Sequence, residues 1–299
     1  MQIKTFASHV SEFLQCAPGT ELSESAARYL LGSIDYHEGK RPYELVDIAL
    51  QDALSRYSVE VKNIDSTQSS RLGRLYTRLG GFLLKIRRDI RESTYRFVKA
   101  HELAHTLAYD RLGAEPRRYF SNSPSEEKIC NAIARHLLLP KEMRSKTHPG
   151  PLLLSPVFLN ASKFSDLAKD YRVHPWQIVR LEFEVKQSDT DSLVAILWRQ
   201  ETESVLHVVD CISPQGIYIP IGDRCFKGNR DNQGVWKGTE ESEVHMDYEY
   251  ITLGSLTGKL QSVSFRVPET GHSIIQILKL DQLHLARASK WKSDRKIRY

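Results

Sequence analysis

The chain has 299 residues, enough for two domains. Its 40% hydrophobic and 26% charged residues are close to the soluble globular average, which excludes a wholly disordered or collagen-like chain. The formal net charge of +5 is too small to indicate a nucleic-acid partner by itself.

The sequence also indicates in which cellular compartment the protein functions. No apolar run approaches the ~18–20 residues that a membrane helix needs. The first ten residues lack the apolar core of a signal peptide. The four cysteines, Cys16, Cys130, Cys211 and Cys225, are far apart and form no Cys-x-x-Cys pair. We therefore expect reduced thiols and a cytoplasmic protein with no membrane partner.

The first half of the chain mostly has the apolar spacing of helices. The predicted helices are 5–16, 22–33, 42–57, 93–109 and 125–138. Two short apolar segments, 72–79 and 81–86, flank Gly80-Gly81 and predict a β-hairpin.

The second half changes character. Residues 140–156 contain four prolines and are expected to be a linker. Two short helices over 162–184 have the spacing of a helix-turn-helix-like pair. Alternating apolar residues then predict strands over 193–198, 205–210, 216–220, 262–267 and 273–280. The sequence thus predicts an α+β protein with three parts, 1–150, 151–188 and 189–299.

The helix over 93–109 carries an HExxH motif, His101-Glu102-Leu103-Ala104-His105. Residues four apart share a helix face, so His101 and His105 can bind the same metal ion. Glu102 lies about 100° round the helix, where it can reach a water at the metal without ligating it. The helix is apolar nearly all round and should be buried, and a metal would satisfy its buried polar side chains.

A catalytic zinc usually has a third protein ligand. The next helix offers Glu127, with Asn131 on the same face, where Asn131 could accept the remaining N–H of His101 or His105. Glu126 points about 100° away and is the alternative third ligand. Another explanation is that both acids merely stabilise the N-terminus of their helix.

Two linked segments resemble the ImmA/IrrE family of metallopeptidases. Residues 96–105, Arg-Phe-Val-Lys-Ala-His-Glu-Leu-Ala-His, are similar to the family's RFxxAHExxH segment. Residues 127–140 are similar to its E-x-x-A-N-x-F-A-x-x-L-L-x-P helix. The resemblance covers about 40–142. Cys130 stands where alanine is usual, Ile133 where phenylalanine is usual, and Tyr109 where many members have histidine.

This resemblance implies a zincin-like HExxH metallopeptidase domain over 1–150 that uses Zn²⁺. It also implies a protein substrate, a helix-turn-helix transcriptional repressor, whose cleavage induces stress, prophage, mobile-element or defence genes. Tyr109 lies four residues past His105, so its hydroxyl could donate to a developing oxyanion. The alternative is that Tyr109 packs at the helix end.

A hypothesis of another class is a DNA-binding or ligand-sensing regulator with a vestigial or structural zinc site. Gln177 and Arg180 of the helix-turn-helix-like segment could read DNA. The balanced charge of that segment argues against DNA reading, and the ImmA/IrrE resemblance implies instead an accessory packed on the first domain. For 189–299 we expect a sensor or docking role. The intact Glu102 favours the enzyme, because a structural site needs no general base.

Overall fold

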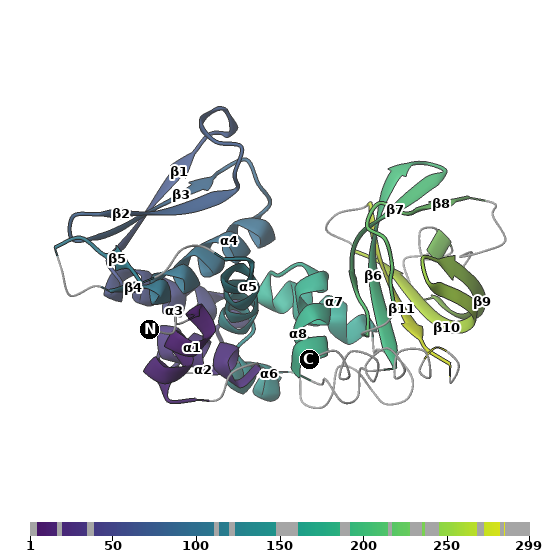
Figure 1. Ribbon diagram of the computed structural model, residues 1–299, viewed down its shortest axis with the longest axis horizontal. Coiled ribbons are helices and arrows are strands. Elements are labelled where there is room, and N and C mark those ends of the chain that lie inside the picture. The colour runs from purple at the N-terminus through teal and green to yellow at the C-terminus, as the bar shows by residue number, and fades with distance from the viewer. Residues whose placement is uncertain are drawn as a thin grey trace. The chain divides into compact units, whose positions relative to one another are not determined.

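Figure 1 presents the computed structural model of the chain. The structure describes residues 5–16, 20–34, 39–110, 114–119, 123–147, 161–185, 192–214, 217–227, 235–236, 245–267, 272–281 and 284. Its contacts divide the chain into a first unit, Met1–Pro151 with Lys163–Leu181, and a second unit, Leu152–Ser162 with Glu182–Tyr299. The segment 151–188, expected as a part of its own, is shared between them. Helices and sheets in one chain confirm the α+β class.

Helices make up most of the first unit (Figure 1). They are α1 (Phe6–Leu14), α2 (Thr20–Leu31), α3 (Pro42–Arg56), α4 (Glu92–His105), α5 (Pro124–Leu138), α6 (Lys141–Thr147), α7 (Ala161–Tyr171) and α8 (Pro175–Val185). Local chemistry sets the start of α5, because Pro124 opens it and the Ser123 hydroxyl accepts the N–H of Glu126 at 3.2 Å. The expected linker 140–156 contains α6 at its start, and residues 148–160 lie outside the described part.

A three-stranded sheet lies beside α4. Its strands are β1 (Val59–Ile64), β2 (Gly73–Arg78) and β3 (Gly81–Arg87), in the order β1-β3-β2. The hairpin β2–β3 forms as predicted, and β1 pairs in parallel with β3 on its other side. Two short strands, β4 (Tyr109–Asp110) and β5 (Arg117–Arg118), follow the end of α4. The order leaves β2 at one edge of the three-stranded sheet.

Arg96 fixes α4 within the first unit. Its side chain is buried, and its Nε donates to Oδ1 of Asp47 on α3 at 2.9 Å. Its Nη1 donates to the carbonyl oxygens of Tyr171 and Arg172. Those carbonyls end α7 and have no partner within that helix. One guanidinium therefore joins α4 to α3 and to the helical pair α7–α8.

Replacing Arg96 with alanine is expected to lower the free energy of unfolding of this unit by about 2–4 kcal/mol, because buried carbonyls and Asp47 lose their donor. Lysine at the same position keeps the charge but not the planar fork, so it should restore only part of the stability. Urea unfolding measures both. Arg71→Ala, an exposed control, should change stability by less than about 0.5 kcal/mol. An equally small change at Arg96 would contradict the expectation.

The second unit contains a six-stranded antiparallel sheet in the order β8-β7-β6-β11-β10-β9. The strands are β6 (Leu193–Thr202), β7 (Val205–Ile212), β8 (Arg224–Phe226), β9 (His245–Leu253), β10 (Leu256–Arg266) and β11 (Ser273–Lys279). Residues 217–220, expected in a strand, lie outside strands. Trp198 donates from Nε1 to Gln276 at 3.0 Å, and Gln276 donates to Ser262 at 3.3 Å. This polar chain crosses three strands and is fully hydrogen-bonded at Trp198, as a buried indole requires.

None of the helices that the structure describes is long and apolar enough to cross a membrane.

Candidate metal centre

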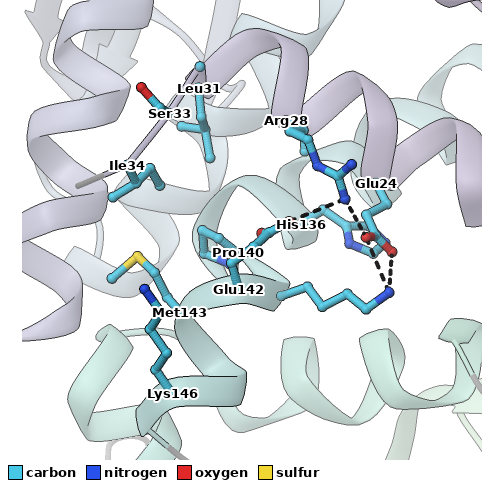
Figure 2. Close-up of a pocket in the computed structure, with 13 residues that line it drawn as sticks. Glu24, Arg28, Leu31, Ser33, Ile34, His136, Pro140, Glu142, Met143 and Lys146 are labelled. Atoms are coloured by element: carbon cyan, nitrogen blue, oxygen red, sulfur yellow. Dashed lines mark hydrogen bonds and ion pairs between the residues drawn. The ribbon is translucent and has the colours of Figure 1, made fainter. Parts of the chain in front are cut away.

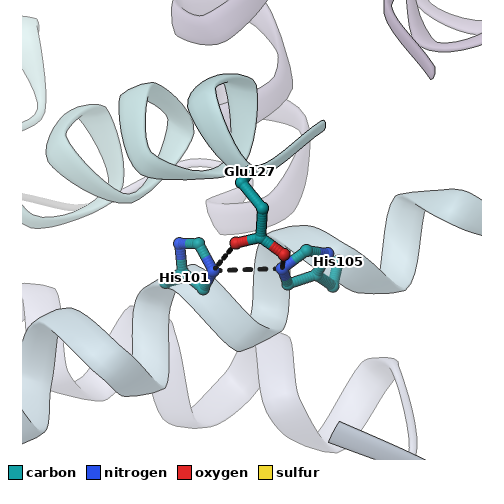
Figure 3. A group of neighbouring side chains, drawn as sticks. All are labelled: His101, His105 and Glu127. Carbon is teal, nitrogen blue, oxygen red and sulfur yellow. Dashed lines mark hydrogen bonds and ion pairs between the residues drawn. The ribbon is translucent and has the colours of Figure 1, made fainter. Parts of the chain in front are cut away.

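The packing of α4 against α5 brings His101, His105 and Glu127 together (Figure 3). The two Nε2 atoms lie 3.0 Å apart. The Glu127 carboxylate oxygens lie 3.2 Å from Nε2 of His101 and 3.5 Å from Nε2 of His105. Both rings are largely buried, whereas the Glu127 side chain is 50% exposed. The three residues could therefore hold a metal ion that is reached from one side.

The spacing of these atoms suits a tetrahedral ion. With bonds of ~2.0–2.1 Å, a tetrahedral zinc sets its ligand atoms about 3.3–3.4 Å apart. The three observed separations, 3.0, 3.2 and 3.5 Å, bracket that value. Two imidazoles and one carboxylate are also a donor set of catalytic zinc sites that keep an open position. The residues present thus fit the metal that the sequence predicts.

The far side of the His105 ring is held by Glu126. Its carboxylate lies 2.7 Å from Nδ1 of His105 and also accepts a hydrogen bond from Arg118 on β5. Burial opposes ionisation of Glu126, but His105 and Arg118 outweigh it and lower its pKa. An ionised carboxylate only accepts, so Nδ1 carries a proton, and in the neutral ring Nε2 turns a lone pair toward the other two ligands.

Cys130 completes a second group that could hold a metal, with His105 and Glu126. Its Sγ lies 3.6 Å from Nδ1 of His105, and all three residues are buried. Burial and the neighbouring carboxylates raise the pKa of Cys130 well above its usual range, so the thiol keeps its proton. Metals bind the thiolate, and Nδ1 already donates to Glu126. These contacts favour the group on the Nε2 side as the metal site.

The pKa values of the two imidazoles shift in opposite directions. Burial, followed by repulsion from His105, lowers the pKa of His101 to about 4, so this ring is neutral and suited to a metal. Burial also lowers the pKa of His105, but the carboxylates of Glu126, Glu102 and Glu127 outweigh it and raise the pKa. Three carboxylates around one ring therefore favour a positive charge beside it, whether a proton or a metal ion supplies it.

The position expected for Asn131 is only partly the observed one. Asn131 lines the same cavity as Glu127, and its side chain favours the protonated form of His101. However, Nδ1 of His101 has no hydrogen-bond partner among the described residues, and Nδ1 of His105 is bound by Glu126. Glu126, considered in the sequence as an alternative ligand, therefore makes the contact that was expected of Asn131.

Glu102 lies between the ligands and the edge strand. The backbone N–H of Leu75 on β2 donates to its Oε2 at 2.9 Å. Burial raises the pKa of Glu102, which suits a group that must accept a proton. A cavity of about 620 Å³ is lined by β2 and the segment before it, by α4 and by α5, and it contains all three ligand residues and Glu102. The sequence did not reveal that Leu75 orients this carboxylate.

Gly73 allows β2 to approach α4 this closely. A Cβ at Gly73 would lie 2.2 Å from Cγ1 of Val98, far inside van der Waals contact. We expect Gly73→Ala to lower the free energy of unfolding by about 1–3 kcal/mol, as overpacking does. In Gly73→Ala/Val98→Ala the clashing methyl is gone, so the loss should be smaller than the sum of the two single losses. Strict additivity in urea unfolding would refute this packing.

Tyr109 and Arg118 line the cavity together. Nη1 of Arg118 lies 3.5 Å from the Tyr109 hydroxyl, and the guanidinium carbon lies 5.4 Å from the centre of the Tyr109 ring. The Tyr109 ring also packs against Phe82 in a T-shaped pair, with centroids 5.2 Å apart. Tyr109 thus both packs at the helix end and turns toward the cavity. Arg118 could not be recognised in the sequence, because it belongs to a two-residue strand with no motif.

His136, near the C-terminal end of α5, lines a different cavity of about 340 Å³ together with Arg28, Lys141 and Met143 (Figure 2). The residue is 3% exposed, and neither ring nitrogen has a partner among the described residues. Burial, reinforced by Arg144, Arg135 and Lys141, lowers its pKa to about 3. His136 is therefore a buried neutral ring in a positive environment.

This environment predicts an acid-sensitive fold. The pKa of His136 is about 3 in the folded chain and about 6.5 when unfolded, so the unfolded chain binds more protons below about pH 6.5. As the pH decreases below about 6.5, the free energy of unfolding should fall. This group contributes at most about 1.4 kcal/mol of that loss per pH unit. His136→Asn, which does not titrate, should lose less Tm between pH 7 and 4.5 than the wild type. Equal losses would assign the acid sensitivity elsewhere.

The residues expected to read DNA lie on α8. Gln177 is half-buried and its Oε1 is a buried acceptor, while the guanidinium carbon of Arg180 lies 5.6 Å from the centre of the Trp176 ring. A recognition helix presents exposed polar side chains to the bases. Neither side chain is exposed, so this geometry does not favour base reading by α8.

Comparisons with known proteins add little to this site. No protein-family model matches the chain, and no curated protein matches it. Among solved structures, one titled "Mycobacterium tuberculosis transcriptional regulator" is similar at 12% sequence identity, with a TM-score of 0.46. The match covers 89% of this chain and 77% of that chain.

Proposed function

We propose that this chain is a zinc-dependent endopeptidase that cleaves a protein substrate. The observation that carries the proposal is the arrangement of four side chains in one cavity: a His101, His105 and Glu127 donor set with Glu102 beside it. Glu102 does not belong to the donor set. A site that only stabilised the fold would have no use for a buried carboxylate turned toward an accessible cavity.

His101, His105 and Glu127 would hold the zinc. When bound, zinc supplies Lewis-acid chemistry, polarising a carbonyl group and making water more acidic. The contact from Glu126 keeps the His105 ring in the tautomer that presents Nε2. Arg118 holds Glu126 in turn, so it acts on the donor set through one intervening residue.

Glu102 would act as the general base. Leu75 already donates to Oε2, which leaves Oε1 to take a proton from the attacking water. The same carboxyl can then give that proton to the nitrogen of the departing amine. Tyr109 and Arg118 also line the cavity and could donate to the oxygen that becomes negative during attack.

An extended polypeptide suits the cavity because one wall is an edge strand. Leu72 O accepts from Arg87 N on β3 at 2.9 Å, so alternation turns the backbone groups of Gly73 and Leu75 away from β3. A substrate segment could bind there by strand addition to the backbone of Gly73 and to the carbonyl of Leu75, whose N–H already donates to Glu102. The choice of a helix-turn-helix repressor as the substrate comes from the ImmA/IrrE resemblance of residues 96–140.

The test uses the full zinc-loaded chain with two kinds of substrate, any helix-turn-helix repressor found encoded beside its gene and an unstructured peptide library. Mass spectrometry should find a cut in the repressor that needs zinc and is absent with Glu102→Gln. Cleavage of peptides alone would remove the repressor and keep the peptidase. A chain that retains zinc and cuts neither substrate would support the regulator with a structural metal instead.

A further inference from the structure

The outer face of the three-stranded sheet carries a row of positive charges. Lys62 on β1 is paired in register with Lys85 on β3, and Lys85 is paired with Arg74 on β2. Residues in register share a face, and neighbouring strands are about 4.8 Å apart. Like charges directly opposite each other destabilise a sheet. We call Lys62, Lys85 and Arg74 the basic row.

Other cations near the row are neutralised. Arg78 pairs with Glu60, Arg87 with Asp89, and Arg88 with Asp65. The basic row itself has no carboxylate partner within the described residues. Two members of the row lie over the Tyr76 ring instead. The guanidinium carbon of Arg74 is 5.2 Å and Nζ of Lys85 is 5.0 Å from the ring centre.

The row ends at the candidate active site. Arg74 is on the edge strand and lines the cavity that contains Glu102 and the metal ligands, as does Arg71 just before the strand. Both arginines are exposed, and neither forms an ion pair with a carboxylate in the described residues, although the charge of Arg71 acts on Glu102 across the cavity. Positive charge without an ion-pair partner therefore runs across all three strands, from β1 to the edge where an added strand would lie.

We propose that the basic row, together with Arg71, binds acidic side chains of the protein substrate next to its cleaved segment. This inference rests on the proposed peptidase function and adds a substrate class to it. Charge complementarity supplies the carboxylates that the row lacks and relieves its internal repulsion. A row only three strands wide that ends at the cavity suits a peptide better than a nucleic-acid backbone, which needs a longer basic track.

Binding tests the row separately from cleavage. The full chain with Glu102→Gln is mixed with fluorescein-labelled 12-residue peptides, one with Asp or Glu at alternate positions and one with Asn or Gln there. By fluorescence anisotropy the acidic peptide should bind at least about tenfold more tightly, and its affinity should fall as salt rises. Adding Lys62→Glu/Lys85→Glu should weaken the affinity for the acidic peptide about tenfold. This is the effect expected when two exposed ion pairs are replaced by like-charged pairs. Lys62→Arg/Lys85→Arg should retain it.

The matched control is Lys40→Glu/Lys169→Glu, which makes the same change in net charge at exposed positions off the sheet. It should leave the affinity for the acidic peptide unchanged. Thermal unfolding accompanies each variant. Lys62→Glu/Lys85→Glu keeps positions 62 and 85 alike in charge but makes positions 85 and 74 opposite, so its Tm should be equal to or above that of the wild type, which separates lost binding from lost fold.

Three results would overturn the proposal. The first is equal affinity for the acidic and the amide peptide, and the second is an unchanged affinity for the acidic peptide after Lys62→Glu/Lys85→Glu. The third is that a 12-nucleotide single strand binds more tightly than the acidic peptide and that the same variant abolishes this binding. Failure of the peptidase function looks different. In that case the zinc-loaded wild type cuts neither peptide, while charge-dependent binding persists.

Discussion

Glu102→Gln is expected to lower the rate of peptide cleavage by at least ~10²-fold, the usual contribution of a positioned general base. Glutamine has nearly the same shape, and its carbonyl oxygen can still accept the N–H of Leu75. It cannot take a proton from water. The effect should therefore appear in kcat, with zinc content and Tm close to those of the wild type.

Single-turnover cleavage of a fluorogenic peptide measures this loss, and metal analysis of the same samples checks the zinc. Glu21→Gln, at an exposed position on α2, is a matched control that should leave the rate unchanged. Cleavage by Glu102→Gln at the wild-type rate would show that another group removes the proton. Loss of zinc together with activity would instead assign Glu102 to metal binding.

Local sequence signals predicted the helices that carry the candidate site. The apolar spacing and the proline and serine at the start of α5 act within a few residues, so helix positions near 125–138 could be read directly. Likewise, the four-residue spacing of His101 and His105 fixes their common face whatever surrounds the helix. The hairpin β2–β3 could be predicted because the turn Gly80-Gly81 lies between its strands.

Features set by distant partners could not be predicted in this way. Strand β1 has a burial pattern with only its two ends buried, and its pairing is parallel to a strand about twenty residues away. No turn or alternation signals such a pairing. Helix α6 lies in a proline-rich stretch that resembles a linker, although its Met143 is buried in the unit.

The assignment of Glu126 and Glu127 shows the same limit within the site. Helical geometry places them about 100° apart, so the sequence predicts that one of them faces the histidines. It does not predict what the other one contacts. The contact of Glu126 depends on Arg118, whose strand has only two residues. Asn131 was expected at a ring nitrogen because it shares a face with Glu127, but that argument ignores Glu126 of the same helix, which Arg118 of β5 holds against the His105 ring.

Metal binding should depend most on the donor set. We expect about one zinc per purified chain, and loss of nearly all of it in His101→Ala and in Glu127→Ala, because each substitution removes a ligand from a set of three. Competition with a chromogenic chelator measures the affinity, and metal analysis the content. Glu21→Ala serves again as the exposed control. Unchanged zinc in both ligand variants would refute this site.

Glu126→Ala distinguishes a ligand from a residue that orients one. If Glu126 only holds Nδ1 of His105, its loss should weaken zinc affinity about 10–100-fold, which is the range for partners of metal-bound histidines. Glu126→Gln should recover part of that affinity, because the glutamine carbonyl can still accept the N–H of Nδ1. Cys130→Ser should bind zinc nearly as the wild type does, since its thiol is protonated. A greater loss in Glu126→Ala and Cys130→Ser than in Glu127→Ala would move the metal to the Nδ1 side of His105.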